Sequence, residues 1–254
     1  MTTETALHPE ELSPLGHAGP PALPAPGGAP RLWAVRVPGN GSALAANAPS
    51  VLDDSELRRA AAFRRDSDRD IYVAVHVGLR LLLGSGLGMN PAEVPFIRED
   101  CPLCGGPHGR PAVRGTPLHF SITHTHGLGL LAFAATPVGV DAETVPAAVD
   151  ADEAGLLLHP READELAALR AERRPAAFAR TWARKEAYLK GLGTGLARSS
   201  SADYVGTGRA PAAGPGNWLI SDVAVGDGHA AAAAVLTGGR RTTDSYKTGG
   251  PRPA

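Results

Sequence analysis

The stretch 178–190, FARTWARKEAYLK, carries three side chains whose types and spacing could do chemistry. Trp182, Glu186 and Lys190 recur every four residues, so in a helix they would lie along one face. A carboxylate on such a face could bind a metal ion or accept a proton, and an ammonium group could neutralise a phosphate. An ordinary ion pair on a solvent-exposed helix face would explain the same spacing.

A pair of carboxylates follows the apolar start of VGVDAE, residues 138–143. In a strand, Asp141 and Glu143 would project from the same face, about 6–7 Å apart. Such a pair could share a hard cation such as Mg²⁺, with Glu186 as a candidate third carboxylate. The alternative is a strand that ends in an acidic loop.

Two further groups of residues could bind phosphate. In FSITHTH, residues 120–126, Thr123 and His124 offer a hydroxyl and an imidazole at the end of a strand. Arginines of the first half could surround a phosphate, namely Arg58, Arg59, Arg64, Arg65, Arg69 and Arg110. A polar turn and a solvated helix face are the plainer interpretations of these two patterns.

Cys101, Cys104 and His108 lie within CPLCGGPHGRP, residues 101–111, and could supply three zinc ligands. A structural zinc site usually closes with four nitrogen or sulfur ligands, and the fourth would have to be a distant histidine. The same spacing could form a redox-active cysteine pair, although its glycine-rich flank does not resemble a helix start.

Composition restricts the classes of protein that these groups could serve. The 254 residues carry a formal charge of −1, which argues against a basic nucleic-acid-binding scaffold. No stretch approaches the ~18 apolar residues of a membrane span, and the first residues lack the apolar core of a secretion signal. Two cysteines make no secreted disulfide framework, so we expect a cytoplasmic protein that binds neither nucleic acid nor membrane.

The elements that must position these groups alternate between strands and helices. Apolar periodicity predicts strands at 31–38, 118–122, 128–134, 138–143, 217–223 and 229–236, and helices at 55–66, 68–84, 160–170 and 175–191. Residues 40–50 are expected to form a loop, and residues 1–30 and 237–254 to be disordered. This order predicts an α+β fold with antiparallel sheets, which would fit two similar halves.

Together and in this order, the motifs resemble those of the Sfp-type 4′-phosphopantetheinyl transferases. The resemblance rests on GVDAE at 139–143 and WARKEAYLK at 182–190, with support from GRP at 109–111 and FSITHT at 120–125. It implies two similar α+β halves, 31–136 and 137–236, with the active site in the cleft between them. The implied reaction moves the phosphopantetheine arm of coenzyme A to a serine of an apo acyl or peptidyl carrier protein, with Mg²⁺ as cofactor, in a monomeric enzyme.

The resemblance also implies roles for individual residues. Asp141, Glu143 and Glu186 would hold Mg²⁺. Glu186 could act as general base toward the serine, and Lys190 would neutralise or protonate the leaving phosphate. The phosphates of coenzyme A would be contacted by Arg59, Arg69, Arg110, Thr123, His124, Lys185 and Lys190.

One departure from the family and two alternative functions qualify this assignment. Relatives often carry arginine where this chain has Ile71, and Arg69 could substitute for it from the previous turn. The same carboxylates would suit a Mg²⁺-dependent phosphohydrolase. The cysteines and His108 would suit a non-catalytic zinc or protein-binding module. The motifs do not distinguish carrier proteins of fatty-acid, polyketide and nonribosomal-peptide synthesis.

Overall fold

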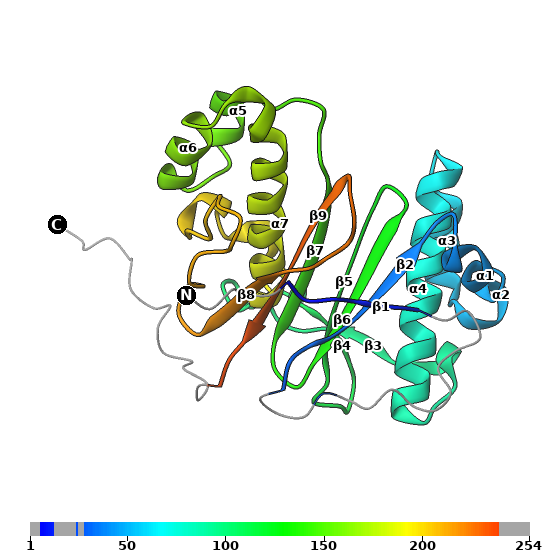
Figure 1. Cartoon of the computed structure of the whole chain (residues 1–254). Helices are drawn as coiled ribbons and strands as arrows, with labels where there is room; N and C mark the ends of the chain where they lie inside the picture. The colour runs from blue at the N-terminus through cyan, green and yellow to red at the C-terminus, as the bar shows by residue number, and fades with distance from the viewer. Residues whose placement is uncertain (1–5, 13–23, 25–27, 239–254) are drawn as a thin grey trace.

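Two β-sheets form the middle of the protein (Figure 1). The computed structural model describes residues 6–12, 24 and 28–238. The six-stranded sheet has the order β1-β2-β6-β5-β4-β3 and comprises β1 (Glu10–Glu11), β2 (Arg31–Arg36), β3 (Phe96–Arg98), β4 (Pro111–Val113), β5 (His119–Thr125) and β6 (Leu128–Ala134). The three-stranded sheet has the order β7-β9-β8 and comprises β7 (Val138–Thr144), β8 (Trp218–Asp222) and β9 (His229–Leu236). Neighbouring strands are antiparallel, apart from the parallel pair β1 and β2.

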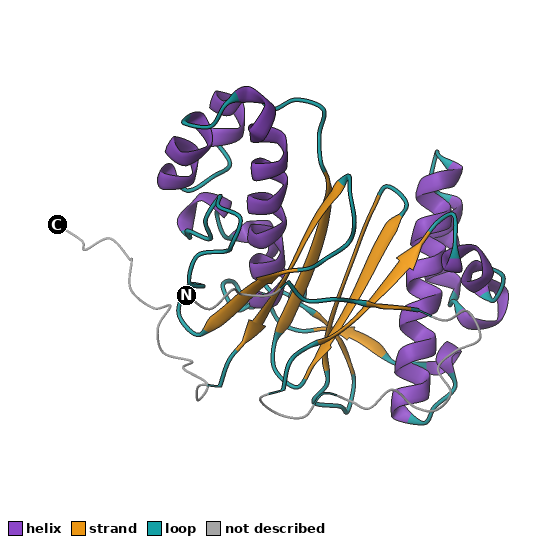
Figure 2. Cartoon of the chain, viewed as in Figure 1, coloured by secondary structure: helices purple, strands orange, loops and turns teal. Residues whose placement is uncertain are grey.

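Helices cover the outer sides of the two sheets (Figure 2). The helices on the side of the six-stranded sheet are α1 (Asn40–Ala45), α2 (Ala48–Val51), α3 (Asp54–Ala61) and α4 (Asp66–Leu87). Those on the side of the three-stranded sheet are α5 (Ala151–Gly155), α6 (Pro160–Ala167) and α7 (Arg174–Leu192). Short 3₁₀ turns, η1 (Pro91–Glu93), η2 (Ala171–Arg173), η3 (Gly195–Ala197) and η4 (Ser200–Ala202), connect these elements. The predicted α+β fold with antiparallel sheets is confirmed.

The two halves of the chain have like connectivity. In the first, β2 leads through the long helix α4 to β5 and β6, and the strands lie in the order β2-β6-β5. In the second, β7 leads through the long helix α7 to β8 and β9, and the strands lie in the order β7-β9-β8. The proposed two-fold relation between the halves, and their boundaries at 31–136 and 137–236, stay predictions.

Strand β6 shows how the core is layered. All seven of its residues are buried, because both faces of the strand are covered. Leu131 and Phe133 belong to the apolar cluster under α4, whereas the alternate residues Leu130 and Ala132 belong to the cluster between the two sheets. A third cluster lies between α7 and the three-stranded sheet. Two layers of sheet therefore separate the two long helices.

The ends of the first-half helices follow local signals only in part. Asp53 and Glu56 form a capping box that begins α3, and an acidic residue is a common helix cap. Helix α4 continues past the predicted end at Gly84 to Leu87, and Gly88 caps it in the left-handed conformation at φ 68°. The predicted loop at 40–50 instead holds the short helices α1 and α2.

The prediction that residues 1–30 are disordered is wrong for residues 6–12. Strand β1 pairs with β2, and Leu12 is only 2% exposed in the core under α4. Leu7 forms a bridge with Val223, just beyond β8 in the other sheet. This segment therefore joins both sheets, and its pairing is non-local, so local composition could not predict it. The predicted tail at 237–254 lies outside the described residues apart from Thr237 and Gly238.

Helix α4 is long and apolar enough to span a membrane by length and composition, with a mean hydropathy of 1.3. In the fold, 61% of that helix window is buried inside the protein, as in the core helix of a globular domain. The expectation that no segment reaches this apolar length is therefore too strict, although burial of α4 explains its composition.

Candidate functional site

Two glycines allow α7 to pack closely on β7. A Cβ at Gly139 would lie 2.5 Å from the backbone nitrogen of Gly191 and even closer to the carbonyl oxygen of Ala187. A Cβ at Gly191 would lie 2.5 Å from the Trp218 ring. The helix and strand therefore touch backbone to backbone, which brings the last turn of α7 beside Asp141.

At this contact Lys190 meets Asp141. The Nζ of Lys190 donates to Oδ1 of Asp141 at 2.6 Å, and it lies 3.4 Å from the carbonyl oxygen of Val140. Thr123 Oγ1 on β5 donates to the same Asp141 oxygen at 3.0 Å. Asp141 is 4% exposed, so this ion pair is shielded on the carboxylate side. The three groups come from both sheets and from α7, and they fix the two halves at one point.

Three carboxyl groups interact around this point. Burial, followed by the nearby charge of Asp141, raises the pKa of Glu143 to about 7. Burial and the charge of Asp141 also raise the pKa of Glu186, whereas Lys190 opposes both shifts. Asp141 Oδ2 is buried without a hydrogen-bond donor. Three carboxyl groups thus share the single ammonium group of Lys190, and a proton or a cation could balance the remaining negative charge.

The donor chemistry of this cluster fits a hard divalent cation. Carboxylate oxygens are the ligands that Mg²⁺ prefers, and a cation would satisfy the unpartnered oxygen of Asp141. The three carboxylates are nevertheless not drawn tightly together. Within the described ranges, the one set of three metal-ligating side chains whose ligand atoms all lie within 4.8 Å is Cys101, Cys104 and His108. A cation at Asp141, Glu143 and Glu186 would therefore require rotation of their side chains.

A cavity of about 570 Å³ lies beside Lys190, between the two halves. The first half supplies most of its lining, from α3, α4, the β3–β4 hairpin and β5, and the second half supplies Lys190, Gly193 and Gly195. Arg110 lies on the cavity wall, where its Nη2 donates to Glu99 Oε2 at 2.7 Å and its Nη1 donates to the carbonyl oxygen of Gly191 at 2.7 Å. Lys190 and Arg110 thus both line the cavity, and both could face an anionic ligand, although their predicted contact with coenzyme A stays a prediction.

Thr123 and His124, by contrast, are not brought together. Adjacent residues of a strand point to opposite faces. Thr123 faces β7 and is occupied by Asp141, whereas the ring of His124 faces α4, 6.2 Å from the centre of the Tyr72 ring. Burial, with the charge of His76 next, lowers the pKa of His124, so this imidazole is disposed to be neutral. Neither Thr123 nor His124 lines the cavity described above, while Ser121 and Ile122 do.

The predicted cations of the first helices lie away from this cavity. Arg59 is exposed on α3, although its charge contributes to the lowered pKa of His124. Arg69 is exposed on α4 and ion-pairs with two aspartates of that helix. Ile71 is 3% exposed in the apolar core, whereas Arg69 is exposed, so the two side chains lie in different surroundings. The role of Arg59 and Arg69 in binding coenzyme A stays a prediction.

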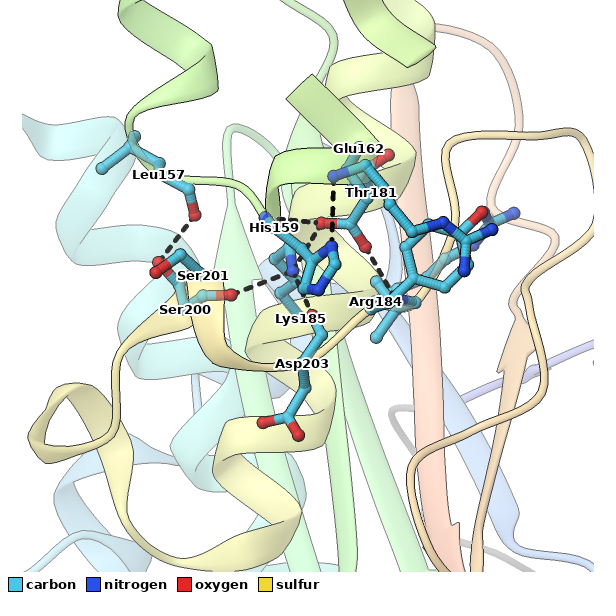
Figure 3. A network of polar contacts seen from close by, with 12 residues as sticks. Leu157, His159, Glu162, Thr181, Arg184, Lys185, Ser200, Ser201 and Asp203 are labelled. Carbon is cyan, nitrogen blue, oxygen red and sulfur yellow. Dashed lines mark hydrogen bonds and ion pairs between the residues drawn. The ribbon is translucent and has the colours of Figure 1, made fainter. Parts of the chain in front are cut away.

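The assignment of Lys185 as a phosphate contact is wrong. Its Nζ ion-pairs with Glu162 at 2.6 Å and donates to the carbonyl oxygens of Ser200 at 2.9 Å and Asp203 at 2.6 Å (Figure 3). The lysine is 2% exposed and Glu162 is fully buried. Residues five apart are ~140° apart around a helix, so Lys185 and Lys190 point to different sides of α7. All three protons of the Lys185 ammonium group are therefore used inside the second half.

Sequence reasoning missed an ionic network on the opposite wall of the cavity. Arg80 is 1% exposed and binds Asp53 at 2.6 Å and Glu56 at 2.7 Å. His76 Nδ1 lies 3.1 Å from Glu56 Oε1, and its ring packs against that of Tyr72 at a tilt of 32°, with ring centres 4.1 Å apart. Tyr72, His76 and Arg80 recur every four residues along α4, which is the signal that could have revealed this stripe.

Comparison with known proteins agrees with this architecture. Residues 137–214, which include β7 and α7, match the model of the 4′-phosphopantetheinyl transferase superfamily. The chain is 34% identical over 167 residues to the 4′-phosphopantetheinyl transferase HetI of Nostoc sp., covering 64% of this chain and 68% of the relative. It is 28% identical over 153 residues to a putative 4′-phosphopantetheinyl transferase of Synechocystis sp., covering 58% of this chain and 59% of the relative. It is 27% identical over 120 residues to a 4′-phosphopantetheinyl transferase of Bacillus subtilis, covering 46% of this chain and 50% of the relative. The chain therefore belongs to the 4′-phosphopantetheinyl transferase superfamily and is a transferase of that kind.

Proposed function

We propose that this enzyme transfers the 4′-phosphopantetheine arm of coenzyme A to a serine of an apo acyl or peptidyl carrier protein, with Mg²⁺ held by Asp141, Glu143 and Glu186. The observation that carries the proposal is the position of Lys190. Its ammonium group binds Asp141 of the carboxylate cluster and also lines the cavity between the halves. One side chain thus connects a cation site with a space for a phosphate-bearing ligand.

The cavity supports coenzyme A as the ligand. Its volume of about 570 Å³ lies within the range of small-molecule sites, roughly 300–1,000 Å³. Lys190 and Arg110 on its wall would face the negative charge of a pyrophosphate. Gly193, which caps the end of α7, and Gly195, at the start of η3, line the same wall, and nothing lies within 4 Å of the position that a Cβ of Gly195 would take.

The carboxylates and the lysine have separate tasks in this reaction. A bound Mg²⁺ supplies charge neutralisation at pyrophosphate oxygens. Glu186, whose pKa is raised by burial and by Asp141, is a stronger base than an exposed glutamate and would accept the serine proton. Lys190 would stabilise the negative charge that develops on the departing phosphate.

A Mg²⁺-dependent phosphohydrolase would use the same residues but would need no carrier protein. Family membership disfavours it, and the acceptor distinguishes the two, because a hydrolase releases free product. Cytoplasmic location, a monomeric state and the pathway that the enzyme serves stay predictions.

Intact-mass spectrometry of a carrier protein tests the proposal directly. Apo acyl and peptidyl carriers, each with a serine-to-alanine control, are incubated with the enzyme and coenzyme A, with Mg²⁺ or with a chelator. We expect a mass gain of one phosphopantetheine only with the serine and with Mg²⁺. Glu186→Gln should abolish the gain, whereas Glu172→Gln at an exposed position before α7 should not. Transfer that persists in the chelator would refute the Mg²⁺ assignment, and no transfer to any carrier by the folded enzyme would refute the reaction.

A further inference from the structure

The loop between β3 and β4 ends in a compact tip that the reaction above does not use. Strands β3 and β4 pair from Phe96 opposite Val113 to Arg98 opposite Pro111. The ladder continues into the loop, where Glu99 N donates to the carbonyl oxygen of Arg110 at 2.9 Å and Gly109 N donates to that of Glu99 at 2.8 Å. Residues 101–108 close this hairpin, and two cysteines and a histidine stand at its tip.

These three side chains converge. The ligand atoms of Cys101, Cys104 and His108 all lie within 4.8 Å of one another, and Cys104 Sγ is 3.0 Å from His108 Nε2. With bond lengths of about 2.3 Å to sulfur and about 2.0 Å to nitrogen, tetrahedral zinc ligands lie about 3.5 Å apart. Both cysteines are free thiols, so no disulfide accounts for their approach.

The backbone of the tip is shaped around the sulfur atoms. Gly105 takes a left-handed conformation, φ 72°, and its N–H bonds the carbonyl oxygen of Cys101 at 2.8 Å. Gly106 N donates to Cys104 Sγ at 3.5 Å. A Cβ at Gly106 would stand 3.1 Å from the His108 ring, so glycine keeps the space between the ligands open.

We propose that Cys101, Cys104 and His108 bind one zinc ion, which fixes the β3–β4 loop against the cavity. Two sulfurs and an imidazole nitrogen favour zinc over the hard cations that carboxylates bind. Within the described part of the chain, no fourth such side chain shares this spacing, so water takes the fourth position. Cys104 and His108 are exposed, which gives the ion access.

The zinc ion would act on the cavity through its wall. His108 and Arg110 both line the cavity, and Arg110 also bonds the end of α7 through the carbonyl oxygen of Gly191. Fixing His108 fixes the chain two residues before Arg110. The zinc ion therefore has a positioning role. Loss of zinc should raise the KM for coenzyme A more than it lowers kcat, an expectation that rests on the proposed function.

Metal analysis of the purified enzyme tests the zinc site without any turnover. We expect one zinc per chain after growth with zinc, loss of zinc in Cys104→Ser and His108→Ala, and retention in His108→Cys, which keeps a ligand. His126→Ala, at an exposed histidine outside the cluster, should keep the metal. Cobalt substituted into the wild-type enzyme should give the intense visible bands of a tetrahedral thiolate site, which does not depend on whether any variant folds.

The contrary results are equally defined. Free thiols that take up neither zinc nor cobalt, or a Cys101–Cys104 disulfide in the enzyme as isolated, would overturn the proposal. If zinc is bound but its loss leaves the KM for coenzyme A unchanged, the positioning role is overturned. If carriers are not modified at all, the proposed reaction fails while the metal content still decides the zinc site.

Discussion

Replacing Gly139 by alanine should disable the enzyme by moving a helix. The added Cβ would lie 2.5 Å from the nitrogen of Gly191, whereas ordinary contacts begin near 3.4 Å. Both atoms that it meets on α7 belong to the backbone, so no side chain can rotate away. The last turn of α7 must therefore move by about 0.9 Å or more, the difference between these two distances.

Such a shift would act on Lys190, the residue before Gly191. The 2.6 Å contact between Lys190 Nζ and Asp141 Oδ1 would be stretched or broken, together with the alignment of Glu186 one turn earlier. Overpacking of a core costs about 1–3 kcal/mol of stability. A misplacement of about 1 Å in a catalytic site can lower the rate by about 100-fold. We expect a loss of transfer activity much larger than the fraction of protein that unfolds.

The assay measures phosphopantetheine transfer to an apo carrier by intact mass, at a temperature well below the unfolding midpoint of Gly139→Ala. Gly208→Ala is the matched control, because its Cβ would meet its nearest neighbour at an ordinary 3.5 Å. Activity of Gly139→Ala within about twofold of the control, with an unchanged midpoint, would contradict the inference that this contact positions Lys190.

Three further perturbations separate charge, burial and catalysis. In metal-free buffer the raised pKa of Glu143, about 7, should make the free energy of unfolding fall as the pH rises from about 4.5 to 7, because the folded chain keeps a proton that the unfolded chain releases. Glu143→Gln should flatten this fall, measured by thermal unfolding at each pH. An unchanged profile in the variant would contradict the raised pKa of Glu143. Lys185→Met should lower the free energy of unfolding by about 3–5 kcal/mol in denaturant, because it leaves the buried carboxylate of Glu162 without its ion pair. Lys190→Met should instead remove transfer activity at a smaller cost in stability. If Lys190→Met were the less stable variant and Lys185→Met the less active one, the roles assigned to the two lysines would be reversed. Leu12→Ala should cost about 2–5 kcal/mol in the same unfolding assay, and no measurable loss would mean that residues 6–12 add nothing to the core.

The sequence predicted what depends on local periodicity. Helix α7 runs from Arg174 to Leu192 against a predicted 175–191, and β7 begins at Val138 as predicted. Trp182, Glu186 and Lys190 are all half-buried, as expected for one stripe at the edge of a packed helix. These features follow from spacing, which the chain itself displays.

What the sequence could not predict depends on distant partners. The sequence does not distinguish the roles of Lys185 and Lys190, which lie in one helical stretch. Only the packing of α6 against α7 shows that Lys185 forms an ion pair with Glu162. Strand β1 is two residues long and pairs with a strand about 20 residues away, so it leaves no periodic trace. Arg110 was predicted from its motif, yet its contact with Gly191 crosses between the halves and has no local signal.

The carbonyl oxygen of Gly191 is where these long-range effects meet. It belongs to the last turn of α7, whose carbonyls lack helical partners, and Arg110 satisfies it at 2.7 Å. The backbone of Gly139 on β7 packs closely against Gly191, and Lys190 is the residue before Gly191 in the chain. The β3–β4 loop and the β7–α7 packing therefore position the cavity wall through one shared contact. Residues that share a contact show non-additive effects, so removing the Cys101–Cys104–His108 cluster should harm Gly139→Ala less than it harms the wild-type enzyme.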